Sequence, residues 1–213
     1  MTNGKRKIFC GALLIVAFAL WTVLVRIVDV EASEPCGSSV GFATLNTLAH
    51  NALGVHMWLY TVTDWLGLVP IAVALGFAIL GLCQWIKRKH ISRVDRDILA
   101  LGVFYIIVIC VYVIFEYVVI NYRPVLINGS LEVSYPSSTT MLVMCVIPTA
   151  IMQLRARIKN KTVRAFVCAV LALFTLFMVM GRLVSGVHWL SDIIGGALVS
   201  SGLVCLYGAF QGK

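Results

Sequence analysis

Six apolar stretches, each about as long as a bilayer is thick, dominate this sequence of 213 residues. They cover approximately residues 8–29, 66–86, 98–120, 138–154, 165–182 and 191–210. A helix needs about 20 mainly apolar residues to cross the hydrocarbon core of a membrane. A membrane strand would instead alternate polar and apolar residues over about ten positions, and these stretches are continuously apolar. The sequence therefore predicts an all-α, polytopic membrane protein with six transmembrane helices.

Composition supports the same prediction, because 61% of the residues are hydrophobic and only 12% are charged. A soluble domain is roughly 45–50% apolar and about 25% charged. A soluble enzyme, a disordered chain and a small disulfide-rich secreted domain are therefore excluded. The seven cysteines show no CxxC pairing, and we interpret them as small apolar side chains. Short connections leave no room for a second domain, so we expect residues 1–213 to form one integral membrane domain.

The basic residues that give the net charge of +8 are grouped in a few segments and are not spread evenly along the chain. Most lysines and arginines fall in residues 5–7, 87–96 and 155–164, which share one side of the membrane if six helices alternate. By the positive-inside rule both termini are then cytoplasmic, and no nucleic-acid partner is indicated. Basic residues before the first apolar stretch also fit a signal peptide. That stretch is longer than the usual 7–15 apolar residues of a signal peptide, so we expect a retained helix.

The longest outer loop, residues 31–64, contains a segment with apolar residues at helical spacing. We interpret this segment, residues 45–60, as an amphipathic helix at the outer membrane interface, with its aromatic residues in the headgroup region. His50 and His56 are six positions apart, so they do not share a helix face as metal ligands would. They have either a structural role or a contact with lipid headgroups. Asp64 is interpreted as the N-cap of the second span.

Polar clusters interrupt the outer ends of the last four spans. They are Glu116 with Asn121-Tyr122-Arg123-Pro124, Tyr135-Pro136-Ser137-Ser138-Thr139-Thr140, Gly181-Arg182, and His188-Trp189-Leu190-Ser191-Asp192. If the helices pack as a bundle, these ends converge on one pocket at the outer membrane surface.

The residue types in these clusters are typical of phosphate chemistry. Arg123 and Arg182 can together clamp a phosphate or carboxylate. The run Pro136–Ser138 at a helix start offers backbone N–H groups and hydroxyls to an anion. His188 and Asp192 are four positions apart, so their side chains can meet on a helix. A carboxylate on one ring nitrogen leaves the other free as a nucleophile. The clusters indicate phosphoryl transfer through a phosphohistidine.

These residues resemble the type-2 phosphatidic acid phosphatase superfamily, which includes the vanadium haloperoxidases. The signature of that superfamily is Lys-x6-Arg-Pro, then Pro-Ser-Gly-His, then Ser-Arg-x5-His-x3-Asp. The partial matches to the first two motifs are Arg123-Pro124 and Pro136-Ser137, and the third is matched by Arg182, His188 and Asp192 with both spacings intact. The resemblance spans about residues 116–192 and implies a phosphatase-like core at about 98–210.

The resemblance also implies roles for individual residues. Arg123 and Arg182 would bind the phosphate oxygens, with Ser137 adding its hydroxyl. His188 would attack phosphorus and Asp192 would orient it. The substrate would be a membrane lipid phosphate, and no metal or other cofactor is implied.

The sequence departs from the family pattern at three positions. Glu116 replaces the phosphate-binding lysine, Thr139 replaces the histidine that protonates the leaving group, and Gly181 replaces a serine. Loss of a general acid typically costs about 10²–10⁴-fold in rate. A phosphate that leaves from a diphosphate has a pKa of about 6, so it departs without being protonated. We therefore expect a lipid diphosphate, such as a polyprenyl diphosphate, as substrate at the outer face of the cell membrane.

Two roles are open for Glu116, seven positions before Arg123. It either serves as an auxiliary acid or forms an ion pair with Arg123. Burial would favour its protonated form, whereas the arginine would favour its carboxylate. Asn128-Gly129 predicts a tight turn after this region.

Two other classes of function compete with an enzyme. A catalytically impaired family member would bind lipid phosphates as a sensor, scaffold or transporter, but binding alone does not need the His188 and Asp192 spacing. A channel or ion-coupled transporter would carry more charge within the membrane than Glu116 alone. The sequence does not predict the lipid tail or the oligomeric state.

Overall fold

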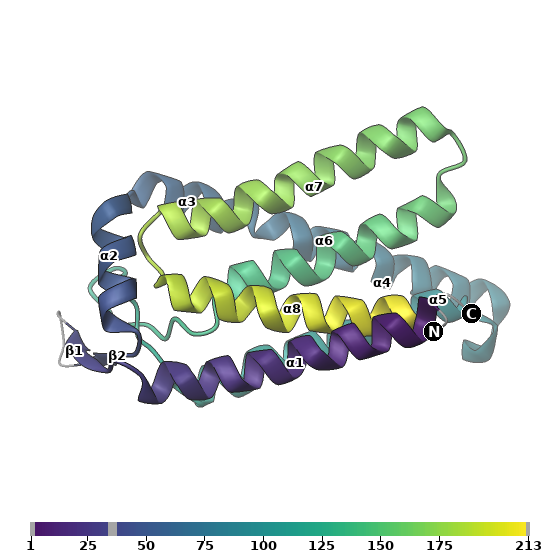
Figure 1. Ribbon diagram of the computed structural model, residues 1–213. Coiled ribbons are helices and arrows are strands. Elements are labelled where there is room, and N and C mark those ends of the chain that lie inside the picture. Colours follow the sequence, from purple (N-terminus) through teal and green to yellow (C-terminus); the bar gives the residue numbers. More distant parts are fainter. Residues whose placement is uncertain (1–2, 34–37, 212–213) are drawn as a thin grey trace.

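The computed structural model describes residues 3–33 and 38–211, so Cys36 and Lys213 lie outside the described residues. Within them, six helical segments are long and apolar enough to cross a membrane. They are α1 (Asn3–Ile27), α3 with α4 (Met57–Leu66 and Leu68–Arg88), α5 (Arg96–Tyr117), α6 (Ser138–Arg157), α7 (Lys161–Val184) and α8 (Leu190–Phe210). The predicted all-α architecture with six transmembrane helices is confirmed, and Figure 1 shows these helices side by side as a bundle.

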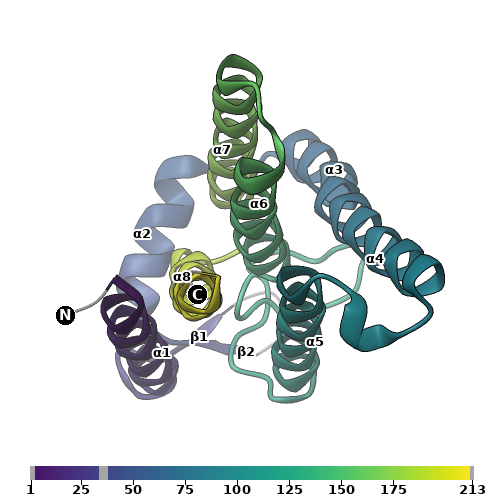
Figure 2. The same cartoon turned by 90° about the vertical axis from the view of Figure 1, so that its right-hand side faces the viewer.

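Helices α6 and α8 form the interior of the bundle. In the end-on view of Figure 2, α8 lies between α1 and α6, and both of these helices contact it. In their most apolar stretches, 56% of the α6 residues and 50% of the α8 residues are buried by protein, against 6% for α7. Polar side chains such as Thr140, Thr149 and Gln153 are therefore tolerated in α6, because they face protein rather than lipid.

Glycines on α8 allow its neighbours to approach closely. A Cβ atom on Gly195 would lie 2.7 Å from the Tyr135 ring, and one on Gly202 would lie 2.8 Å from Ile15 of α1. Small residues at such contacts are how membrane helices pack closely without a hydrophobic driving force between them.

A helix is present in the first outer loop as predicted, but it does not extend as one helix over residues 45–60. The structure has two helices here, α2 (Ala43–Leu53) and α3, separated by Gly54-Val55-His56. Gly54 has a φ of 73° and its N–H donates to the carbonyl of His50, so a residue with positive φ ends α2. Helix α3 then continues into α4 with only Gly67 between them, and the second span is Met57–Arg88 rather than 66–86.

Asp64 is also not the N-cap of the second span, because it lies inside α3. The start of α3 is instead held against the α7–α8 turn. The backbone N–H of His56 donates to the Ser185 carbonyl at 3.0 Å, and a Cβ atom on Gly186 would lie 2.1 Å from the Gly54 carbonyl oxygen. This contact places the side chains of α3 over the end of α7.

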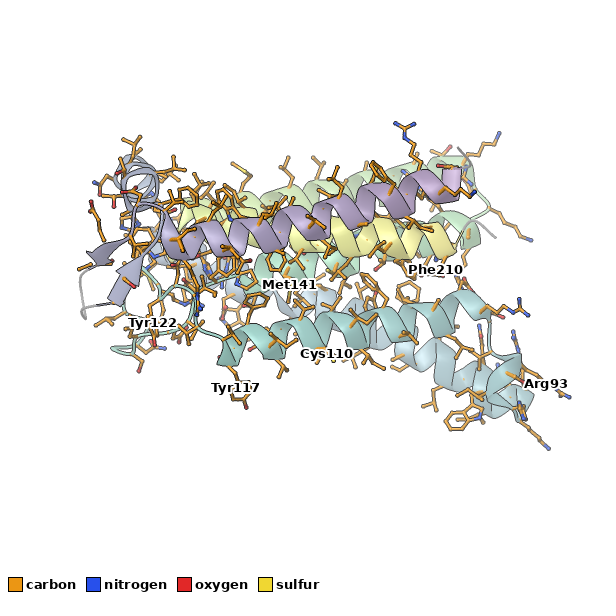
Figure 3. The ribbon with its side chains drawn as sticks, turned by 60° about the horizontal axis from the view of Figure 1, so that its bottom comes forward. Arg93, Cys110, Tyr117, Tyr122, Met141 and Phe210 are labelled. Carbon is orange, nitrogen blue, oxygen red and sulfur yellow. The ribbon has the colours of Figure 1, made fainter. Side chains whose placement is uncertain are left out.

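The remaining elements lie at the two ends of the bundle. The short antiparallel strands β1 (Glu31–Ser33) and β2 (Ser38–Val40) pair with Glu31 opposite Val40, and with α2 they cover one end (Figure 1). Residues 118–137 form an extended loop at that same end, where Tyr122 is labelled in Figure 3. The short helix η1 (Ile91–Arg93) and the labelled Arg93 lie at the opposite end.

Candidate active site

The end of the bundle that carries the 118–137 loop also gathers three of the predicted polar clusters into one buried group. Arg123 comes from the loop, since α5 ends at Tyr117 and not at residue 120. Arg182 is in the last turn of α7, and His188 and Asp192 come from the α7–α8 turn and the first turn of α8. We call these four residues the arginine–histidine cluster. Their exposed fractions are 7%, 1%, 3% and 0%.

The closest contact in the cluster joins Arg123 to His188, with Nη1 3.1 Å from Nε2. A guanidinium has no acceptor and stays charged, so the arginine donates and Nε2 accepts. Burial, together with the charges of Arg123 and Arg182, holds the pKa of His188 well below its usual value. The imidazole is therefore neutral at neutral pH, with its lone pair on Nε2 and its proton on Nδ1.

Asp192 stands on the Nδ1 side of His188, with Oδ2 3.7 Å from Nδ1. This separation exceeds an ordinary hydrogen bond, so in this state the contact is electrostatic. Oδ2 accepts from the backbone N–H of Trp189 at 3.0 Å, and Oδ1 accepts from Asn121 Nδ2 at 3.1 Å. Trp189 is the N-cap of α8. His188 therefore precedes the helix, and the capping carboxylate brings the pair together.

Two asparagines, which the sequence analysis did not single out as site residues, hold the start of α8. Asn46 of α2 is fully buried; its Oδ1 accepts from Ser191 N at 3.0 Å and its Nδ2 donates to Ser191 Oγ at 2.9 Å. Asn121 reaches the same turn through Asp192. Asparagine in a polar cluster is too common a residue to be chosen from sequence alone.

The N-terminus of α6 contributes hydroxyls at the same end. Ser137 donates its backbone N–H to the Asp192 carbonyl at 3.1 Å, which joins α6 to α8. The Ser137 and Thr140 hydroxyls are buried and have no hydrogen-bond partner among residues 3–33 and 38–211. Buried polar groups normally have partners, so these hydroxyls are suited to binding a polar ligand.

Ser138 and Thr139 lie on the wall of an apolar cavity. This cavity, of about 320 Å³, lies between α4, α5 and α6, and its other lining residues are Ile71, Val108, Ile109, Tyr112, Met141 and Leu142. Thr139 is 9% exposed. The position where the family pattern has its general acid thus faces an apolar space.

One of the two roles left open for Glu116, an ion pair with Arg123, is wrong as a prediction, because Arg123 pairs with Glu132. Arg123 Nε lies 3.0 Å from Glu132 Oε2. Glu116 is an exposed residue of the last turn of α5 and lines a small hollow with Ser138. Glu132 reaches Arg123 because the chain folds back between them, and the Arg123 N–H donates to the Glu132 carbonyl at 3.0 Å.

The fold-back is a tight turn at Asn128-Gly129, where φ is 51° and 79°. Ile127 and Ser130 pair across it, as do Tyr122 and Val133. The sequence predicted this turn, but counting residues back from it places Ser134 opposite Arg123, whereas the structure pairs Tyr122 with Val133 and so brings Glu132 to Arg123. Glu132 is therefore a residue beside Arg123 that the sequence analysis missed, because the turn alone does not fix the register of the loop.

Helix α3 contributes a further group that the sequence analysis assigned to the membrane interface. The Arg182 guanidinium carbon lies 4.8 Å from the centre of the Tyr60 ring, and that of Arg123 lies 5.9 Å from it. Arg182 Nη1 also lies 3.4 Å from Thr63 Oγ1 and 3.7 Å from Asp64 Oδ1. The ring of Tyr60 thus contacts both cations of the cluster.

Within the described ranges, no group of three or more histidine, cysteine, aspartate or glutamate side chains is placed to hold a metal ion. The positive charge in the cluster comes from two guanidinium groups.

A family model described as the PAP2 superfamily matches residues 97–212, which is more than half of the chain. The chain belongs to the PAP2 superfamily. A crystal structure described as the first transmembrane PAP2-type phosphatidylglycerolphosphate phosphatase from Bacillus subtilis has the same fold, with a TM-score of 0.64 and 18% identity over 95% of both chains. No curated protein matches the sequence significantly. Membership of the PAP2 superfamily and this fold support a multi-pass membrane phosphatase that acts on a lipid phosphate.

Proposed function

We propose that this protein hydrolyses a lipid diphosphate, such as a polyprenyl diphosphate, on the extracytoplasmic side of a cell membrane through a phosphohistidine intermediate. The observation that carries the proposal is the 3.1 Å contact between Arg123 Nη1 and His188 Nε2, which puts a phosphate-binding cation on the nitrogen that would attack phosphorus. Arg182 belongs to the same cluster, so a phosphoryl group beside Nε2 would meet two guanidinium groups.

Substrate binding would first redirect Arg123. In this structure its Nη1 occupies the lone pair of His188 Nε2, and that lone pair must be free for attack. Phosphate oxygens are stronger acceptors for a guanidinium than a neutral imidazole, because both partners of the new bond are charged. The phosphoryl group would draw Arg123 and Arg182 onto its oxygens, and the Ser137 hydroxyl would donate to the same group.

In the chemical step, the Nε2 lone pair forms a bond to phosphorus while the bond to the leaving oxygen breaks. The imidazole becomes positively charged, with its Nδ1 proton facing Asp192, whose carboxylate stabilises that charge. Water then attacks phosphorus, the bond to Nε2 breaks, and the lone pair returns to the ring. The products are inorganic phosphate and a lipid with one phosphate fewer.

The leaving group decides which lipid phosphate suits this site. Thr139 cannot act as a general acid at neutral pH, and it lies in apolar surroundings. When a lipid diphosphate is cleaved, the leaving group is itself a phosphate and needs no proton, whereas an alcohol leaving from a monophosphate does. Glu116 is proposed as an auxiliary residue at most, since it is exposed at the end of α5.

The apolar cavity between α4, α5 and α6 supports a lipid substrate. Ser138 and Thr139 stand on its wall at the start of α6, one and two residues after Ser137, and its other walls are mainly aliphatic. A hydrocarbon chain in this cavity would hold its diphosphate near the N-terminus of α6, where Ser138 offers a further hydroxyl.

The distribution of basic residues supports a location of the arginine–histidine cluster on the extracytoplasmic side of the membrane. The basic segments 87–96 and 155–164 lie at the other end of the bundle from the cluster, next to the ends of α4, α5, α6 and α7. Arg93 marks this end in Figure 3, far from Tyr122 of the site loop. The positive-inside rule puts that end, with both chain termini, in the cytoplasm.

The test measures phosphate release by the purified protein in detergent. Substrates are a polyprenyl diphosphate, the matching polyprenyl monophosphate and phosphatidylglycerol phosphate. The wild type is expected to favour the diphosphate, and His188→Ala is expected to lose turnover. His90→Ala is the matched control, because His90 is exposed at the opposite end. Brief reaction with labelled diphosphate should leave an acid-labile phosphoenzyme in the wild type but not in His188→Ala.

Two outcomes would contradict parts of the proposal. Faster release from a monophosphate lipid would overturn the diphosphate preference. Equal background release from wild type and His188→Ala, with lipid phosphate binding retained in both, would favour the other reading of the family resemblance, a member that binds lipid phosphates without turnover.

A further inference from the structure

We propose that Tyr60 of α3 is a positioning residue of the phosphate site, and that its ring holds the guanidinium groups of Arg123 and Arg182 next to each other. This inference rests on the proposed function for its consequence in catalysis. Tyr60 lies outside residues 97–212, the part of the chain matched by the family model.

The geometry is that of one aromatic ring shared by two cations. The two guanidinium carbons lie 4.8 Å and 5.9 Å from the ring centre, both within the roughly 6 Å range of a cation–π contact. Arg182 is 1% exposed and Arg123 is 7% exposed, so water screens the repulsion between them poorly. The negative face of the ring offsets part of that repulsion, and its attraction is stronger where the cation is desolvated.

Unlike Tyr60, each carboxylate near the two arginines approaches one of them. Glu132 pairs with Arg123 and Asp64 approaches Arg182, so each carboxylate holds one cation. Their side chains are 43% and 58% exposed, and partly solvated ion pairs stabilise an arrangement only weakly. Tyr60 contacts both cations, so it can determine the distance between them.

The packing of α3 against α7 brings Tyr60 to this place. A Cβ atom on Gly181 would lie 2.7 Å from Thr63 Cγ2 and 3.7 Å from Leu59 Cδ1. The absent side chain at position 181 therefore lets α3 approach the end of α7. This explains why glycine stands where the family pattern has a serine: the space is taken by α3.

The departure at Glu116 makes the placement of the two arginines more important. Where the family pattern has a phosphate-binding lysine, this chain has a carboxylate. Two cations then neutralise the phosphoryl group instead of three, so their separation must match the phosphate oxygens closely. A rigid ring beneath both guanidinium groups would supply that match before substrate binds.

The experiment measures the affinity of the full-length protein in detergent for inorganic phosphate by calorimetry. Tyr60→Phe, which keeps the ring, should bind within about twofold of wild type, and Tyr60→Leu should bind about tenfold more weakly. Tyr117→Leu is the matched control, because Tyr117 is 83% exposed and points away from the bundle (Figure 3). Its affinity should equal that of the wild type.

A second series keeps the shape of the side chain and so separates its electrostatic effect from folding. Tyr60 is replaced by phenylalanine and by its mono-, di- and trifluorinated forms. The fluorinated rings keep the shape of phenylalanine and withdraw electron density from the ring face. Phosphate affinity should fall stepwise along this series, which a purely steric role of the ring would not produce. A flat series, or unchanged affinity in a folded Tyr60→Leu protein, would overturn the inference.

These measurements separate the inference from the proposed function, because phosphate binding does not need turnover. If the wild type releases no phosphate from any lipid but the fluorinated series is graded, the hydrolase proposal fails and the role of Tyr60 stands. If the wild type turns over and the series is flat, the reverse holds.

Discussion

Arg123 Nη1 donates a hydrogen bond to His188 Nε2 at 3.1 Å, across 65 positions of the sequence. This bond gives the Arg123 cation an acceptor and gives Nε2, the nitrogen proposed as the nucleophile, a donor. Because the same arginine also pairs with Glu132, it is held in place before any phosphate arrives. Under the proposed mechanism, phosphate binding and release of the His188 lone pair are then one event.

Replacing Arg123 by lysine should lower kcat by about 10²–10³-fold, the usual cost of removing a donor that stabilises charge in the transition state. Lysine keeps the charge but lacks the planar fork of N–H groups that lets Arg123 pair with Glu132 and turn a second nitrogen from His188 to a phosphate oxygen. Phosphate release under saturating diphosphate measures the effect. The control is Arg93→Lys at the opposite end of the bundle. Near wild-type kcat in the Arg123→Lys variant would contradict the role assigned to Arg123.

The pH profile should have its acid limb at a pH well below the usual 6.5 of histidine, because burial and the two arginines hold the pKa of His188 down. The sign follows from the nucleophile: activity is present above this pKa, where the imidazole is neutral, and is lost as the pH falls through it. In Arg123→Gln one of the charges is gone, so the limb should move to higher pH. It should move only part of the way, since burial is the larger cause. An unmoved limb would mean that another group is being titrated.

Replacing Asn121 by alanine should destabilise the protein by about 1.5–3 kcal/mol, because the buried Asp192 carboxylate loses a donor. The same change should lower kcat, since Asp192 would turn toward other donors and away from His188. Thermal unfolding and phosphate release measure the two effects. Asn51→Ala on the exposed side of α2 serves as the control. Unchanged stability and kcat in the Asn121→Ala variant would show that Asp192 does not depend on this bond.

Introducing serine at Gly181, as in the family pattern, should destabilise the protein by about 1–3 kcal/mol through overpacking against Thr63. If α3 moves away to make room, phosphate affinity falls as well, because Tyr60 moves with it. The double variant Gly181→Ser with Thr63→Ala removes the colliding methyl group and should recover much of the loss. Strict additivity of the two single changes would argue against this contact as the cause.

The change Thr139→His, which restores the family residue, should shift substrate preference toward lipid monophosphates. A general acid is worth about 10²–10⁴-fold where the leaving group needs a proton, so the ratio of monophosphate to diphosphate turnover should rise by about tenfold or more. An aryl phosphate with a weakly basic leaving group provides the internal control, and its rate should stay the same. If all three rates change in parallel, the new side chain acts through packing and not as an acid.

Much of the candidate site could be predicted from the sequence, because the residues of the third family motif are close together in the chain. Arg182, His188 and Asp192 lie within eleven residues of one another, and a turn with a capped helix start is enough to bring them together. The Asn128-Gly129 turn, likewise local, was correctly predicted. The partner of Arg123 was wrongly predicted, because two carboxylates lie near Arg123 in the sequence and the path of the 118–137 loop selects Glu132 over Glu116.

What the sequence determined by itself is the membrane-spanning architecture, because the length of an apolar stretch decides whether a helix can cross a bilayer, whatever surrounds it. What only the tertiary structure decided is the contribution of α3. Arg182 and Thr63 are 119 positions apart, and Tyr60 meets Arg123 from a helix that the sequence pattern assigned to the membrane surface. Such contacts depend on how closely whole helices approach, which here is set by a missing side chain at Gly181 and a backbone bond from His56 to Ser185. Neither is visible in the periodicity of α3 itself, since periodicity reports which face is apolar and not which neighbour that face meets.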